Sequence, residues 1–147
     1  MFFMHRWQPQ VHALFRIILG FLFSCHGAQK LLGLPHPPAN GTVELMSFMG
    51  FAGLLELVGG LMILVGLFTR PVAFILSGMM AVAYFMAHQP QGALPITNKG
   101  EPAVLYCFAF FFLSSAGAGL YSLDAYLERR KREQGHPGGD ARLRKAS

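Results

Sequence analysis

The stretch that decides the fold is residues 11–33, VHALFRIILGFLFSCHGAQKLLG. It is long and apolar enough to cross a membrane, since a spanning helix needs about 20 mostly apolar residues. It nevertheless carries Arg16, His26 and Lys30. A charge at the centre of a spanning helix costs about 2.5–3.5 kcal/mol on insertion scales. We therefore expect these three side chains to face other helices rather than lipid.

The composition of the whole chain also indicates a membrane protein. Of its 147 residues, 53% are hydrophobic and 13% are charged, about half the charged share of a soluble domain. Seven of the 12 Lys and Arg residues follow Leu127, so positive charge is concentrated at the C-terminal end. A basic pI can indicate nucleic-acid binding, but basic residues beside a membrane segment are explained by topology and anionic lipid. We expect the lipid bilayer, and no nucleic acid, as a partner.

Three more apolar segments follow the first, so the sequence predicts an all-α fold, an integral membrane four-helix bundle. The expected helices cover residues 11–33, 47–68, 71–88 and 102–123. Prolines and polar residues between the segments cannot continue a helix and predict loops. The expected organisation is an interfacial N-terminus at 1–10, a transmembrane domain at 11–127 and a basic, partly disordered tail at 128–147.

Four spans place both termini on one side of the membrane. Cytoplasmic loops and tails are rich in Lys and Arg, so the tail predicts cytoplasmic N and C termini in a bacterial-type plasma (inner) membrane. The turn at Arg70 is then cytoplasmic, and the two long loops, whose only Lys or Arg is Lys99, face outward. Small residues such as Gly59 and Gly60 predict close helix packing rather than a wide pore.

Glu56 is the single charge in the core of the second expected helix. With a rise of about 1.5 Å per residue, it lies near the depth of His26, and Lys30 lies one turn above His26. Intramembrane acids usually mark a pathway or a site, so we predict that Glu56 and His26 handle protons as catalytic residues. The alternative is structural, a carboxyl and an imidazole that hold helices together. Arg16, Lys30 and His26 are all open as the partner of Glu56.

Further polar residues are expected to bind substrate. Arg16 and Lys30, with His88 and Glu101 at the outer mouth, are the predicted substrate-binding residues. Each has a structural alternative: Lys30 could extend to the outer headgroups, and Glu101 could cap a helix start.

An ion pair involving Asp124 is expected at the cytoplasmic end of the bundle. Arg70 and Asp124 are predicted to form it as a structural contact, and Arg16 competes for the same carboxylate. Cys25 and Cys107 show no C-x-x-C or zinc spacing, so we expect small apolar fillers, with a redox pair as the alternative. No second ligand lies at metal spacing from His26, and no metal site is predicted.

Several short motifs follow one another along the four segments. They are Arg16, Gly20, His26-Gly27-x-x-Lys30-Leu31, Glu56 with Gly59-Gly60, Gly66-Leu67-x-Thr69-Arg70, Asn98-x-Gly100-Glu101 and Gly117-x-Gly119-x-x-Ser122-Leu123-Asp124. In this order and spacing the chain resembles the DoxX family over residues 11–127, with Ala118 standing where relatives often have proline. The resemblance implies a small four-helix membrane protein similar to subunits of thiosulfate:quinone oxidoreductase, which pass electrons from a sulfur compound to membrane quinone.

We therefore expect a quinone-linked oxidoreductase, or the membrane subunit of a redox complex, that acts on a small sulfur or thiol compound. Quinone is the cofactor that the resemblance implies. The chain has no dinucleotide glycine motif, C-x-x-C-H motif or cysteine quartet, so its own motifs indicate no flavin, haem or iron–sulfur site, and electron transfer would need Cys25 and Cys107, a partner subunit or direct substrate-to-quinone chemistry. A redox partner subunit and a homo-oligomer are the expected protein partners. The alternatives are a non-enzymatic membrane scaffold or assembly partner for soluble redox proteins, and an oligomeric small-molecule transporter.

Overall fold

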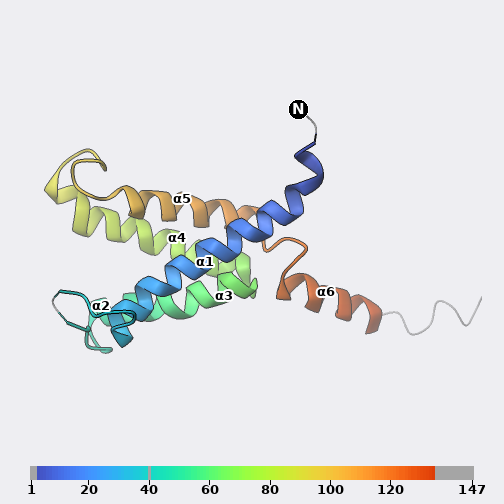
Figure 1. Ribbon diagram of the computed structural model, residues 1–147, viewed down its shortest axis with the longest axis horizontal. Coiled ribbons are helices and arrows are strands. Elements are labelled where there is room, and N and C mark those ends of the chain that lie inside the picture. The colour runs from blue at the N-terminus through green and yellow to red at the C-terminus, as the bar shows by residue number, and fades with distance from the viewer. Residues whose placement is uncertain (1–2, 40, 135–147) are drawn as a thin grey trace, which may run out of the picture.

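The computed structural model describes residues 3–39 and 41–134, and within these ranges all regular secondary structure is helical (Figure 1). The predicted all-α class is confirmed. Three helical segments are long and apolar enough to cross a membrane: His5–Leu32, Phe48–Val65 and Thr69–Gln91. A fourth apolar helix, α5 (Glu101–Ala116), has 16 residues and is shorter.

The first segment begins with the 3-10 turn η1 (His5–Trp7) and continues as α1 (Gln8–Leu32). Proline stands in the first turn of α1, where no backbone N–H is needed for the helix. Gly33 ends the helix with a left-handed φ of 68°, the usual conformation at a helix C-terminus.

The second and third segments each contain a π-helical turn. The second consists of α2 (Phe48–Leu54), η2 (Leu55–Gly59) and α3 (Gly60–Val65), and the third of α4 (Thr69–Ala83), η3 (Tyr84–His88) and the 3-10 turn η4 (Gln89–Gln91). The Ser47 hydroxyl caps α2 by accepting a hydrogen bond from the Gly50 N–H at 3.0 Å, a standard N-cap contact.

The fourth predicted helix, at 102–123, is shorter than expected. It ends at Ala116, because Gly117 and Gly119 adopt φ values of 83° and 77° that break the helix. A separate helix, α6 (Leu123–Gln134), follows, so residues 128–134 of the expected tail are helical. Residues 135–147, for which disorder was predicted, lie outside the described part of the chain.

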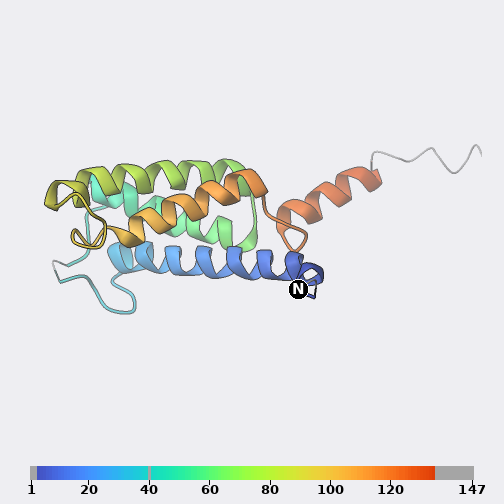
Figure 2. The same cartoon turned by 90° about the horizontal axis from the view of Figure 1, so that it is seen from above.

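Consecutive segments run in opposite directions. The loop after α1 and the loop before α5 lie at one end of the bundle, while η1, the turn before α4 and the start of α6 lie at the other (Figures 1 and 2). α1 packs along the second segment and α4 packs along α5, and α6 leads away from the bundle (Figure 2). The fold therefore consists of two helix pairs joined side by side.

Glycine lets the backbones of α1 and the second segment touch. A Cβ atom on Gly27 would lie 2.3 Å from the backbone nitrogen of Leu57, and one on Gly20 would lie 2.5 Å from that of Leu64. Real Cβ atoms do not approach backbone so closely. Since apolar surface alone drives no association in lipid, such close contact is the main source of helix–helix attraction there.

The buried core is small and lies where the two helix pairs meet. It consists of Leu19, Phe23, Ile63, Ala73, Leu76, Phe110 and Leu113. Large apolar side chains such as Phe74, Phe108 and Phe111 point outward and are exposed. An apolar surface of this extent is unsuited to water but suited to lipid, so these faces are those of a membrane protein.

Candidate functional site

Arg16 is a structural residue in this fold, in contrast to the predicted substrate-binding role. Its side chain is 1% exposed. Nε donates to the Ala118 carbonyl at 3.1 Å, one terminal nitrogen to the carbonyls of Ile63 (2.6 Å) and Leu64, and the other to that of Tyr121 (2.7 Å). All three nitrogens are therefore occupied by backbone carbonyls of α3 and the segment after α5, and none is directed at a ligand.

The predicted ion pair between Arg70 and Asp124 is not formed. The two carboxylate oxygens of Asp124 accept hydrogen bonds from the backbone N–H groups of Phe68 (2.8 Å) and Thr69 (2.9 Å). These groups stand at the start of α4, where backbone donors lack helical partners. Arg70 instead donates to backbone carbonyls at the end of α5, including that of Ser115. Both charges thus satisfy helix ends rather than each other.

Lys30 is the partner of Glu56. Nζ lies 2.6 Å from Oε1, and the two side chains are 27% and 8% exposed. Within the described residues this is the one ion pair closer than 4 Å. The other oxygen, Oε2, is buried and has no hydrogen-bond partner. A buried acceptor without a donor is costly, so this atom is an open position for a ligand that donates a hydrogen bond.

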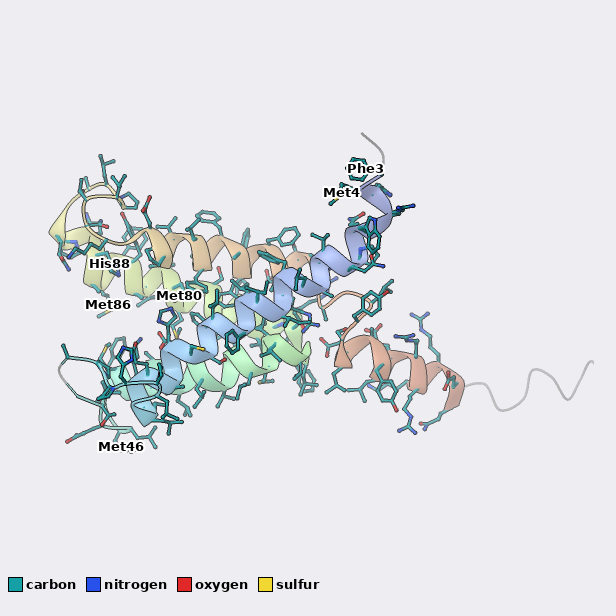
Figure 3. All side chains as sticks on the ribbon, in the orientation of Figure 1. Phe3, Met4, Met46, Met80, Met86 and His88 are labelled. Carbon is teal, nitrogen blue, oxygen red and sulfur yellow. The ribbon has the colours of Figure 1, made fainter. Side chains whose placement is uncertain are left out.

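The ion pair borders a cavity of about 770 Å³ between α1, α2–η2, α4–η3 and the start of α5. Its polar lining is made by His26, Lys30, Glu56, His88, Lys99 and Tyr106. The rest is apolar and rich in methionine; Met80 and Met86 lie on the α4–η3 segment beside this space (Figure 3). An apolar enclosure with a few convergent polar groups is the usual form of a small-molecule site.

Both π-helical turns contribute to this cavity. Glu56 lies in η2 and His88 in η3, and both side chains line the cavity. A π-turn inserts one residue and rotates the following face of a helix, and such turns frequently occur at functional sites. Sequence periodicity does not reveal them, so this feature could not be predicted.

His26 and Tyr106 meet across the cavity. Their ring centroids are 5.9 Å apart with an interplanar angle of 89°, and Tyr106 packs in turn on Phe23 and Phe110. Tyr106 is not among the site residues predicted from the sequence. The sequence feature that could have identified Tyr106 is a hydroxyl-bearing side chain one turn after Pro102. It lies in the half of the fourth segment that faces His26.

The remaining predicted residues differ in whether they line the cavity. His88 faces the cavity and its Nδ1 lies 3.1 Å from the Asn98 carbonyl oxygen. Glu101 is exposed at the first position of α5 and does not line the cavity. Cys25 and Cys107 are free thiols, and the sulfur of Cys107 lies 3.6 Å from the Ser77 hydroxyl on α4. Among the described residues no three His, Cys, Asp or Glu side chains are placed to hold a metal ion.

These features define a class: a helical membrane protein whose glycine-packed segments enclose an apolar cavity with an ion pair. Residues 11–89, more than half of the chain, match the DoxX family, so the chain belongs to that family, as its motifs predicted. The matched residues run from Val11 within α1 through η3 and include the Lys30–Glu56 pair.

The similar proteins cover nearly the same length. An uncharacterized protein of Haemophilus influenzae is 39% identical over 125 residues, covering 82% of this chain and 93% of its own. The Escherichia coli inner membrane protein YqjF is 30% identical, covering 78% and 90%. A Bacillus subtilis protein named putative oxidoreductase CatD is 26% identical, covering 81% and 88%. No solved structure matches the chain.

Proposed function

We propose that this protein is a quinone-linked oxidoreductase, or the membrane subunit of one, acting on a small sulfur or thiol compound. The observation that carries the proposal is the Lys30–Glu56 ion pair, which borders a largely apolar cavity of about 770 Å³ and keeps one carboxylate oxygen without a donor. Support also comes from the Bacillus subtilis relative, whose name is putative oxidoreductase CatD.

We further propose four spans, with both termini on the cytoplasmic side of a bacterial inner membrane. The end of the bundle that carries the N-terminus and α6 also carries Arg70 and the basic run Arg129–Arg132, which suits the cytoplasmic face. α5 is about 24 Å long at 1.5 Å per residue, so the bilayer must thin slightly there, at modest cost. The Escherichia coli relative is named an inner membrane protein.

The residues present fit a quinone head group. When bound, a quinone accepts two electrons and two protons and leaves as a quinol. The Oε2 atom of Glu56 suits the hydroxyl of a quinol, because a carboxylate oxygen accepts such a bond. Lys30 uses one of its three N–H donors on Glu56, which leaves donors for a carbonyl oxygen. The apolar lining suits a ring.

The chain's own residues would then serve proton transfer and orientation. Lys30 holds Glu56 in place and offers positive charge to a developing oxyanion. Glu56 takes up and gives back a proton at Oε2, and His26 and Tyr106 orient the ring against Phe23. Two thiols that form a disulfide lose two electrons and two protons, and the acceptor gains both. Two thiosulfate ions that join through a new S–S bond lose only the two electrons, so the two protons then come from water. Donor and acceptor must meet directly or through a partner subunit.

The test is quinone binding and reduction by the purified protein in nanodiscs, with simple thiols and thiosulfate as donors. Glu56→Gln removes the carboxylate, and Glu101→Gln is the matched control because Glu101 lies outside the cavity. We expect donor-dependent quinol formation in wild type and Glu101→Gln and its loss in Glu56→Gln, with all three folded. Binding without turnover would assign the donor chemistry to a missing subunit. Absence of binding would overturn the proposal.

The second candidate is a non-enzymatic scaffold, favoured by α6. This helix extends away from the bundle (Figures 1 and 2) and exposes Arg129, Arg130 and Lys131. A protruding charged helix could dock a soluble redox protein. Deleting residues 129–147 distinguishes the two functions, because it should remove a co-purifying partner if the protein is a scaffold and leave quinone binding unchanged if it is an enzyme.

A further inference from the structure

We propose that the cavity opens sideways into the membrane between α2 and α4, and that this opening holds the apolar chain of a lipid-soluble quinone whose head lies at Glu56. This inference rests on the proposed function and adds a route and a second set of binding residues to it. An isoprenoid chain is the occupant to which the proposal commits.

The first observation is that several side chains belong to the cavity and to the outer surface at once. Phe51 on α2, and Val82 and Met86 on the α4–η3 segment, line the cavity and are exposed. All three lie in segments of membrane-spanning length and composition. A wall that is both cavity lining and lipid-facing surface is the rim of an opening, so the cavity is continuous with the hydrocarbon region.

The second observation is how the two helix pairs meet. A Cβ atom on Gly59 would lie 2.9 Å from a methyl group of Leu76, so the second and third segments are in tight contact at this level. From there toward the loop end, α2 and the end of the α4–η3 segment diverge (Figure 1), and the cavity occupies the space between them. The contact at Gly59 closes the deep end, and the opening lies above it.

The third observation is the distribution of polarity. The ion pair of Lys30 and Glu56 lies on α1 and η2, whereas the lining from α4 is apolar, with Ile75, Met79 and Val82. A ligand that is complementary both to the ion-pair side and to the apolar α4 side of the cavity has a polar head and an apolar chain. Methionine side chains adapt to irregular shapes, which suits a flexible, branched chain better than a rigid ring.

The test separates head from chain by comparing two quinones with the same ring, one bearing a long isoprenoid chain and one bearing none. Val82→Trp narrows the opening at its rim. Val65→Trp is the matched control, because Val65 is 46% exposed against 49% for Val82 but lies outside the cavity. Ala52→Trp, on the facing helix, is a second variant that places the same bulk on the opposite side of the opening.

We expect both cavity variants to bind the long-chain quinone about tenfold more weakly and the chainless quinone within about twofold of wild type. Val65→Trp should bind both as wild type does. If a folded Val82→Trp and a folded Ala52→Trp both bind the long-chain quinone normally, the opening is wrong while the proposed function stands. If wild type binds neither quinone, the proposed function itself fails.

A phospholipid acyl chain is the competing occupant of the same opening. Native mass spectrometry of the protein in defined lipid distinguishes the two. If the long-chain quinone displaces one bound phospholipid from wild type and the chainless quinone does not, the opening belongs to the quinone chain. If a phospholipid stays bound when the long-chain quinone saturates the protein, the proposal is overturned.

Discussion

The two cations of α1 look alike in the sequence but have opposite environments. Arg16 is 1% exposed and gives all three nitrogens to backbone carbonyls. Lys30 is 27% exposed and binds a carboxylate that keeps one oxygen without a donor beside a cavity. One cation therefore joins helix ends through backbone carbonyls, and the other pairs with a carboxylate that keeps one oxygen unpaired.

This difference shows that the presence of a charge in a membrane segment does not by itself mark a site. The cost of placing a charge in the membrane is offset by hydrogen bonds or by a counter-charge, and incomplete compensation is typical of functional sites. The saturation of hydrogen bonds distinguishes the two cases. At Arg16 the acceptors are fixed backbone atoms, whereas at Glu56 one acceptor is free.

Replacing Arg16 should have the largest effect. Arg16→Met keeps the apolar stem but removes the donors to four carbonyls. Since each buried polar group left unsatisfied costs about 1–3 kcal/mol, we expect a loss of about 4 kcal/mol or more in the free energy of unfolding. The measurement is reversible unfolding in mixed micelles. Arg6→Met makes the same chemical change at an exposed position and should be nearly neutral; equal stability of the two variants would contradict the structural role.

Replacing a glycine at the contact of α1 with α3 should have the second largest effect on stability. Gly20→Ala places a methyl group 2.5 Å from the Leu64 backbone nitrogen, so the helices must separate, at a cost of about 1–3 kcal/mol. The same unfolding measurement applies. Gly78→Ala is the control, because a Cβ there meets nothing within 4 Å, and it should stabilise α4 by about 0.5–1 kcal/mol. If both changes stabilise the protein, the close packing is wrong.

The Lys30–Glu56 pair should contribute less to stability than Arg16, because Lys30 is partly exposed. In a double-mutant cycle of Lys30→Met and Glu56→Gln, we expect a coupling energy of about 1–2 kcal/mol, between the values of surface and buried pairs. A coupling as large as the loss in Arg16→Met would mean that the pair serves mainly the fold. A coupling near zero would mean that the two groups are not partners in the membrane.

The structure places three of the predicted site residues, Lys30, Glu56 and His26, on one cavity, and their roles stay predictions. The sequence predicted the helical class and the approximate segments. It could not predict the partner of Glu56, because a shared depth does not fix the rotation of a helix about its axis. It misassigned Arg16 for a related reason. The acceptors of Arg16 are backbone carbonyls, which every residue has, so no side chain in the sequence identifies them.

The predicted end of the fourth helix was also wrong, because the glycines near it are compatible both with a continuous helix and with a break. Glycine is common inside membrane helices, so Gly117 and Gly119 do not by themselves indicate a break within the helix expected at 102–123. In the structure they adopt positive φ and end α5. That break lets the Ala118 and Tyr121 carbonyls reach Arg16. The misplaced helix end therefore accounts for two of the four carbonyls that accept hydrogen bonds from Arg16, and the other two lie on α3.

Replacing Asp124 should have the smallest effect on stability, and it tests a second polar group at the same end of the bundle as Arg16. Asp124 caps α4 through the N–H groups of Phe68 and Thr69. Asp124→Asn keeps one carbonyl acceptor and loses the other acceptor and the charge, so we expect a loss of about 0.5–1 kcal/mol. Glu128→Gln, one turn later and exposed, is the control and should change stability little. A loss well above 1 kcal/mol would indicate an ion pair with Arg70 or Arg16 after all. A small loss with unchanged quinone binding would show that Asp124 serves only the fold, as the saturated hydrogen bonds of Arg16 indicate for that residue at the same end, in contrast to the unpaired Oε2 of Glu56.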